Sequence, residues 1–134
     1  MDTQYSGKLS GKMLYFMEET DNTFDAANDC MAVPVERFKG FRQAGTTVTE
    51  LTMEFDPMLG YAAGDAAGTH DDTFVADSVV LTITANKHKE VMADILGLIH
   101  GTHSDGFIVI SDDSNSVFAS QNITGCAITI TAEA

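Results

Sequence analysis

The sequence predicts an α+β domain, mainly β, built as an antiparallel β-sandwich or barrel of about six or seven strands with one flanking helix. Three observations support this class. Several short segments alternate apolar and polar residues, one segment (residues 87–100) has helical periodicity, and the order strand–helix–strand occurs once. The length of 134 residues fits a single domain, residues 1–134.

The first third of the chain predicts short strands and an edge element. Apolar runs at residues 12–17 and 31–35 favour strands, with a polar, acidic loop between them. Pro34 cannot donate to a strand ladder, so the second strand belongs at a sheet edge or beside a bulge. The cation-rich segment 36–45 predicts a connection or an edge element.

Clear alternation begins at residue 46. The segment 46–55 predicts a half-buried strand, with Val48 out of phase as a bulge would place it. The segments 78–84 and 123–131 alternate in the same way. Between the strands predicted at 46–55 and 78–84, residues 56–77 form a long stretch without periodicity, which predicts a projecting loop.

The segment 87–100 predicts the helix. Its apolar residues Val91, Met92, Ile95, Leu96 and Ile99 form one stripe. Asn86 is a suitable N-cap, and Gly101 is suited to a left-handed C-terminal stop. Beyond the helix, a strand at 107–111, a polar turn at 112–115 and a returning strand at 116–120 predict a hairpin.

The charge balance excludes several classes of protein. Twenty Asp and Glu against seven Lys and Arg give a net charge of −13, which rules out a surface built to neutralise nucleic-acid phosphates. No apolar run is long enough to span a membrane, and the start of the chain does not resemble a secretion signal. Folding in a cytoplasm is therefore expected, with Cys30 and Cys126 as reduced, buried thiols.

Two clusters contain metal-binding residue types, and both have simpler explanations. His100, His103 and Asp105 lie close together at the end of the helix, but no spacing specifies a further ligand. The simpler explanation is that His100 interacts with the carbonyl end of its helix and His103 lies in a loop. Residues 112–116 offer oxygens for calcium, although a hairpin turn accounts for the same residue types. The sequence predicts no bound metal and no cofactor.

Signatures of catalysis are also missing from the sequence. It has no Gly-x-Ser-x-Gly elbow and no glycine-rich phosphate loop before a helix. The protein is therefore predicted not to be an enzyme.

The polar side of the predicted sheet has an unusual composition. Threonine and glutamate occupy it without an accompanying Lys or Arg, whereas ordinary solvated sheets mix cations with acids. This composition suits a surface along which DNA slides without binding. The residues concerned are Glu50, Thr52, Glu54, Thr82, Thr84, Thr129 and Thr131.

The order of elements resembles that of the small tail tube proteins of long-tailed bacteriophages, which share a fold with the type VI secretion tube protein. The likeness covers residues 46–131: the alternating strand, the long loop, the strand 78–84, the helix, the strand 107–110, the acidic turn and the terminal strands ending Ala127-Ile128-Thr129-Ile130-Thr131. It rests on element order, length and charge.

The resemblance implies a β-barrel or sandwich that assembles into hexameric rings, which stack into a hollow tube for genome delivery. The seven Thr and Glu residues above become candidates for lining an acidic lumen, and segment 56–77 becomes a stacking loop toward the next ring. The implied inter-subunit residues are Arg37, Lys39, Arg42, Lys87 and Lys89, together with Asp65, Asp71 and Asp72 of the loop.

The implied partners are other copies of the chain and other tail proteins, such as sheath, terminator or baseplate components. DNA would pass without specific binding, no membrane is involved, and the protein would belong to the virion tail after assembly in the host cytoplasm. Two alternatives stay open. One is a capsid decoration or other virion structural protein, and the other is a small soluble metal- or ligand-binding module centred on His100, His103 and Asp105.

Overall fold

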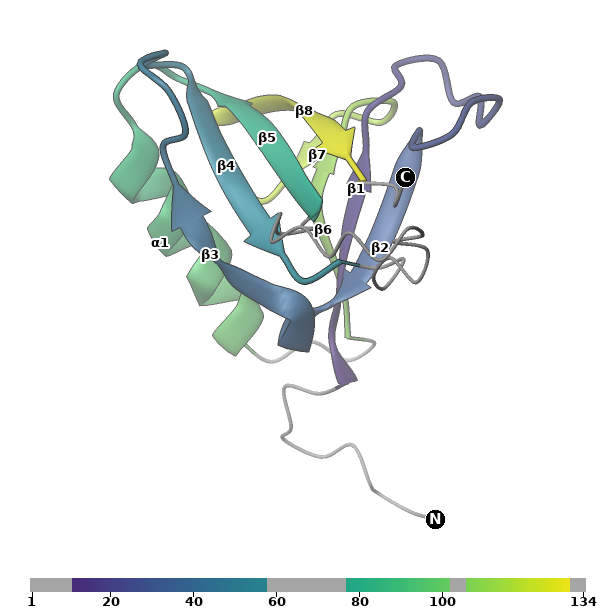
Figure 1. Cartoon of the computed structure of the whole chain (residues 1–134), viewed down its shortest axis with the longest axis horizontal. Coiled ribbons are helices and arrows are strands. Elements are labelled where there is room, and N and C mark those ends of the chain that lie inside the picture. The colour runs from purple at the N-terminus through teal and green to yellow at the C-terminus, as the bar shows by residue number, and fades with distance from the viewer. Residues whose placement is uncertain (1–10, 58–76, 102–105, 131–134) are drawn as a thin grey trace, which may run out of the picture.

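The computed structural model describes residues 11–57, 77–101 and 106–130, which form two four-stranded sheets and one α-helix (Figure 1). Sheet A has the order β2-β1-β6-β7, made of Cys30–Pro34, Met13–Met17, Phe107–Asp112 and Val117–Phe118. Sheet B has the order β3-β4-β5-β8, made of Phe38–Arg42, Glu50–Phe55, Asp77–Ile83 and Ile123–Thr129. The predicted class, mainly β with one helix, is confirmed.

Strand direction differs between the sheets. Sheet B is antiparallel throughout, whereas in sheet A β1 runs parallel to β6. The helix α1, His88–His100, connects β5 of sheet B to β6 of sheet A. The single strand–helix–strand unit, β5–α1–β6, therefore connects sheet B to sheet A. The parallel partner of β6 is β1, a strand much earlier in the chain.

The core lies between the inner faces of the two sheets. The rings of Phe16 in sheet A and Phe55 in sheet B meet edge to face, with centroids 5.9 Å apart. Helix α1 lies on the β3 side of the molecule in Figure 1 and adds Val91, Ile95 and Ile99 to the same cluster. Other members of this core are Leu14, Met31, Val33, Leu51, Met53, Val79, Leu81, Ile83, Ile108, Ile110, Ile123 and Ile128.

The predicted helix is confirmed within one residue and Gly101 is its C-cap, but the predicted N-cap and the predicted left-handed conformation of Gly101 are wrong. Lys87 is the N-cap, and Asn86 has φ 65°, a left-handed conformation that Asn tolerates. Gly101 has φ −79° and ψ 179°, which is extended rather than left-handed. The Nζ atom of Lys12 instead donates to the carbonyl oxygens of Ile99 at 2.5 Å and Gly101 at 2.8 Å.

No helix among the described ranges is long and apolar enough to cross a membrane.

Several other boundaries differ from the prediction. The returning strand predicted at 116–120 covers only Val117–Phe118, and the last strand ends at Thr129. Strand β4 begins at Glu50, because residues 47–50 form a turn closed by a hydrogen bond from the Glu50 amide to the Thr47 carbonyl. Val48 is therefore outside the strand and is not a bulge residue. Asp77 was expected at the end of the long loop, but it begins β5 and is fully buried. Residues 58–76 of that loop lie outside the described ranges.

The edge predictions for the first third of the chain are confirmed. Pro34 ends β2, an edge strand of sheet A. The segment after it forms the 3-10 turn η2, Val35–Arg37, and then β3, an edge strand of sheet B. The pairing of β3 with β4 shifts register between Phe38 and Gly40, so Lys39 is the extra residue of a bulge.

Candidate functional site

The side of sheet B that faces away from the core brings together most of the predicted lumen residues. Strand register places Glu54, Ser78 and Thr129 in one row across β4, β5 and β8, and it places Glu50 opposite Thr82. A further row runs from Thr52 through Val80 to Ala127. We call this side the polar face, made of Glu50, Thr52, Glu54, Ser78, Val80, Thr82, Ala127 and Thr129.

The predicted residues differ in how far they contribute to that surface. Glu50, Thr82 and Thr129 are exposed and Glu54 is half-buried, but Thr52 is only 4% exposed. Thr52 stands in the middle of the sheet, between Arg42 and Val80 on its neighbouring strands, and so it adds little accessible surface. Thr84 is exposed but follows the end of β5, and Thr131 lies outside the described residues.

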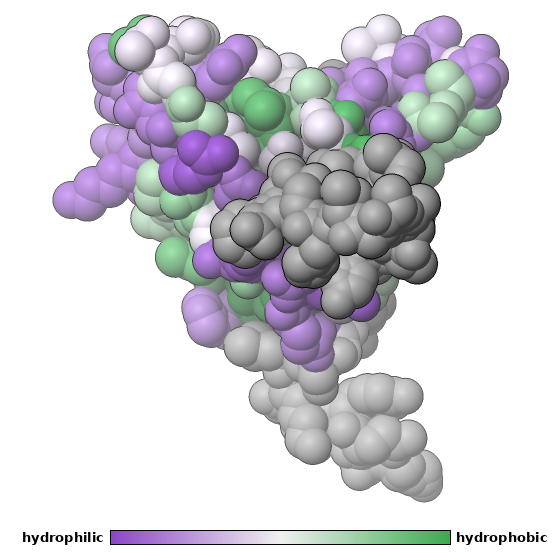
Figure 2. Space-filling model, viewed as in Figure 1, coloured by the Kyte–Doolittle hydropathy of each residue, from purple (hydrophilic) through white to green (hydrophobic). Residues whose placement is uncertain are grey.

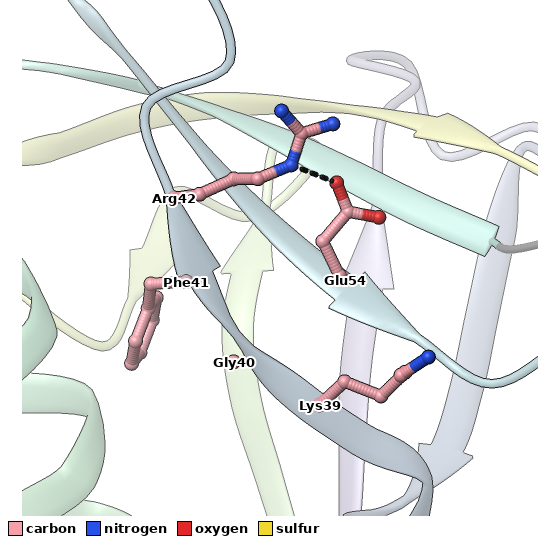
Figure 3. A pocket seen from close by; sticks show the side chains of 5 residues that line it. All are labelled: Lys39, Gly40, Phe41, Arg42 and Glu54. Atoms are coloured by element: carbon pink, nitrogen blue, oxygen red, sulfur yellow. Dashed lines mark hydrogen bonds and ion pairs between the residues drawn. The ribbon is translucent and has the colours of Figure 1, made fainter.

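The prediction that no cation shares this side of the sheet is wrong. Arg42 is opposite Thr52 in the β3–β4 pair, and its Nε atom lies 2.7 Å from Oε2 of Glu54 (Figure 3). The error has a simple cause. The alternation along β4 shows which of its residues share a face. It does not show which β3 residue lies opposite Thr52, because that register depends on the bulge at Lys39.

A pocket of about 380 Å³ opens beside these residues at the β3 edge. Lys39, Gly40, Phe41, Arg42 and Glu54 line it. In Figure 3 the Arg42 side chain reaches over β4 toward Glu54, whereas the Phe41 ring points away toward the side of α1. Gly40 has φ 145° and leaves open space where a Cβ would stand. We call this the β3 pocket.

The predicted inter-subunit cations fall in two places. Arg37, Lys39 and Arg42 lie along the β3 edge, where Lys39 is 3.8 Å from Asp56 and the side chains of Lys39 and Arg42 are more than half exposed. Lys87 and Lys89 lie at the start of α1, with Lys87 4.0 Å from Glu90. Asp65, Asp71 and Asp72 are outside the described residues, so their part in this prediction has no structural account.

The opposite edge of sheet B is capped by two carboxylates, Glu18 and Asp113, whose capping role the sequence did not predict. Oε1 of Glu18 accepts a hydrogen bond from the Ile128 amide at 2.6 Å, and Oδ2 of Asp113 accepts one from the Cys126 amide at 3.2 Å. Both amides belong to β8, whose described strand partner is β5 alone. Side-chain acceptors thus satisfy part of an edge that could otherwise pair with another strand.

Two titratable groups at this capped edge, Asp113 and Cys126, have raised pKa values. Burial raises the pKa of the Asp113 carboxyl, although hydrogen bonds from the Cys126 amide and the Ser111 hydroxyl oppose the shift. Burial, and then the charge of Asp113, raises the pKa of the Cys126 thiol to about 12. That thiol is protonated at neutral pH and is a poor nucleophile. Both cysteines were expected to be buried, but Cys30 is exposed on the edge strand β2 and Cys126 is half-buried. Both are free thiols.

The described residues contain no cluster of three or more His, Cys, Asp and Glu side chains placed to hold a metal ion. The carboxylate of Asp112 accepts hydrogen bonds from the Ser114 amide, the Asn115 amide and the Asn115 side chain. These are the bonds of a hairpin turn, as the simpler interpretation predicted. His100 is exposed, whereas His103 and Asp105 lie outside the described ranges.

Sequence signals could have found part of what was missed. Glu18 follows the apolar run of β1 directly, and Asp113 follows β6, so each is an acid at the end of a predicted strand. Their target, the outer edge of β8, depends on the packing of the two sheets. Comparison with protein-family models, curated proteins and solved structures gave no match.

Proposed function

We propose that the protein is a virion structural protein, a subunit of a tail tube whose stacked rings, hexameric by family resemblance, enclose a channel for DNA. The observation that carries the proposal is the polar face. Its exposed positions on β5 and β8 are Thr82, Ala127 and Thr129, none of which carries a charge, while acids stand beside them on β4.

Such a surface fits a channel that must not hold DNA. Hydroxyl and methyl groups make no ion pair with phosphate, and the carboxylates of Glu50 and Glu54 repel it weakly over the screening length of about 10 Å at ordinary salt. The cation that shares the face, Arg42, lies 2.7 Å from Glu54, so a carboxylate offsets its charge at the point where phosphate would approach. Attraction strong enough to stall a moving polyanion is therefore avoided.

The distribution of sheet edges also supports self-assembly. The edge at β8 is capped within the chain by Glu18 and Asp113, whereas the β3 edge carries exposed cations and an open pocket. A closed ring needs two different surfaces that meet between neighbours. An asymmetric subunit with one capped and one open edge suits that requirement.

Cysteine accessibility tests the placement of the polar face. In a Cys30→Ser background, Thr129→Cys places a thiol on the polar face and Leu96→Cys places one on the exposed side of α1. Assembled protein should react at residue 129 with a small maleimide but not with a maleimide that carries a bulky polymer. Residue 96 should react with both. Equal reaction of residue 129 with both reagents in assembled protein would contradict an inward-facing polar face.

A further inference from the structure

We propose that the β3 pocket binds the acidic loop between β1 and β2 of a second copy of this chain, with Phe24 as its apolar anchor. The inference rests on the proposed function in one respect, that the chain assembles with itself. The two surfaces that meet lie on opposite sides of the subunit (Figure 1).

The first surface has more cations than acids on its own segment, since residues 35–42 contain three Lys and Arg residues and one acid, Glu36. Of the six Lys and Arg residues within the described ranges, three lie on the β3 segment: Arg37, Lys39 and Arg42. Arg42 pairs with Glu54 and Lys39 approaches Asp56, but the Arg37 guanidinium donates to the uncharged carbonyl oxygen of Pro57. Exposed pairs of this kind are weak and exchange partners readily. In a chain of net charge −13, this is a place where an acidic segment can dock.

The second surface has the opposite imbalance. Residues 18–29 hold five acids and no Lys or Arg. Glu18 accepts a hydrogen bond from the Ile128 amide of β8, and the buried Asp29 accepts one from the Ala26 amide. The negative charge of Asp29, followed by burial and the charge of Asp21, raises the pKa of Glu19, so like charges repel one another in this loop. A cation supplied from outside the chain would relieve this repulsion.

An exposed aromatic ring lies within the same loop. Phe24 is 60% exposed, the highest value among the large hydrophobic side chains of the described residues, and Asp25 follows it. The loop has a defined shape, because Asp21 accepts hydrogen bonds from the amide and hydroxyl of Thr23 and Ser114 bridges the Glu19 carbonyl and the Asn22 amide. Aromatic residues, Phe among them, are enriched in protein interfaces relative to the rest of the surface.

The two surfaces match in chemistry. The β3 pocket has open space beside Gly40 and a cation on each side of it, Lys39 and Arg42. A phenyl ring seated there would lie near two cations, which aromatic faces attract. Carboxylates beside the ring would meet the same cations. An apolar centre with a charged rim is the usual anatomy of a protein interface.

Geometry makes this a contact between copies. In Figure 1 the β1–β2 loop projects at the upper right, whereas β3 runs along the lower left of the molecule. Figure 2 shows that the upper-right lobe is largely hydrophilic. One subunit cannot bring its own loop to its own β3 pocket. A contact between different surfaces is heterologous and propagates from copy to copy, either closing a ring or extending a fibre.

Charge reversal with complementation tests the pairing. The edge variant is Lys39→Glu with Arg42→Glu, and the loop variant is Glu19→Lys with Asp25→Lys, which leaves the Asp21 turn intact. Sedimentation velocity over a range of concentrations measures assembly, and thermal melting verifies folding. Each variant alone should need about tenfold more protein, or still more, to assemble, because like charges then face one another. An equimolar mixture of the two variants should recover assembly, as should one chain carrying all four changes.

The apolar anchor has its own matched pair. Phe24→Ala should weaken assembly, whereas Val48→Ala, at another exposed apolar position, should not. If the wild type forms rings or tubes and the edge, loop and Phe24 variants assemble equally well, the pairing is wrong and the proposed function stands. If the wild type stays monomeric at high concentration, both are wrong. Loss of assembly in the charge variants without recovery in the mixture would also contradict the pairing.

Discussion

The guanidinium of Arg42 reaches across the β3–β4 pair to Glu54, with Nε 2.7 Å from Oε2. This contact joins the polar face to the β3 pocket, because both residues line the pocket and Glu54 belongs to the face. It also sets the charge balance of the face, where a cation offsets one of the two glutamates. The acidity of the polar face is therefore smaller than the threonine and glutamate pattern alone predicted.

A double-mutant cycle with Arg42→Ala and Glu54→Ala should give a small coupling energy. The Arg42 side chain is 60% exposed, and exposed pairs contribute about 0.2–1 kcal/mol. Urea unfolding of the four proteins measures this value. Coupling well above about 1 kcal/mol would show that the pair holds β3 onto the sheet rather than sitting as a replaceable surface contact.

Replacing Lys12 should destabilise the C-terminal end of α1. Its ammonium group donates hydrogen bonds to the carbonyl oxygens of Ile99 and Gly101, at the negative end of the helix dipole. We expect Lys12→Met to lower the free energy of unfolding by about 1–2 kcal/mol, since the site is partly buried. Lys89→Met, an exposed cation in the first turn of the same helix, is the matched control and should change little. Equal effects in urea titrations would contradict this role.

Glu18 should protect the edge of β8. Glu18→Ala leaves the Ile128 amide without its acceptor and should cost about 1–3 kcal/mol, whereas Glu18→Gln keeps an amide oxygen that can accept the bond. Hydrogen exchange of the Ile128 amide should become faster in the Ala variant than in the Gln variant. Indistinguishable exchange rates in the two variants would mean that this carboxylate does not cap the strand.

The two thiols should differ sharply in reactivity. Cys30 is exposed, while burial and Asp113 raise the pKa of Cys126 to about 12. Iodoacetamide at mildly alkaline pH should modify one thiol of the folded protein and both thiols of the denatured protein, as counted by mass spectrometry. The Cys30→Ser variant should resist modification until it is denatured. Rapid modification of the folded Cys30→Ser variant would contradict the burial of Cys126.

Mild acidification should stabilise the fold. The pKa of Asp113 is raised by burial, and that of Glu19 by neighbouring acids, so the folded chain takes up these protons at a higher pH than the unfolded chain. The free energy of unfolding therefore rises as pH falls through their folded pKa values toward about 4, the ordinary carboxyl value. Asp21 acts in the opposite sense, because hydrogen bonds from Thr23 lower its pKa. The melting temperature should be higher near pH 5 than near pH 7, and the dependence should weaken in Asp113→Asn. A lower melting temperature near pH 5 would oppose this account.

Local patterns predicted much of the fold. Alternation placed β4, β5 and β8, and the apolar stripe placed α1, because these signals lie within single elements. The missed features depend on residues far apart in the chain. The Lys12 contact spans 87 residues to Ile99, and the Glu18 contact spans 110 residues to Ile128. The position of Arg42 depends on a bulge, since one extra residue in β3 changes which side chains share a face.

The same limit applies to the candidate site. The sequence grouped Glu50, Glu54, Thr82 and Thr129, and strand register places them on one face. The burial of Thr52 and the pocket beside Gly40 required the assembled sheet. Whether these residues line a channel is a property of several copies together, which neither the pattern of one chain nor its fold contains.

Negative-stain electron microscopy of the purified wild-type protein over a range of concentrations tests the central proposal most directly. The account predicts rings with a central hole, and stacked tubes as the concentration rises. Monodisperse monomers at every concentration, with neither rings nor tubes, would contradict it.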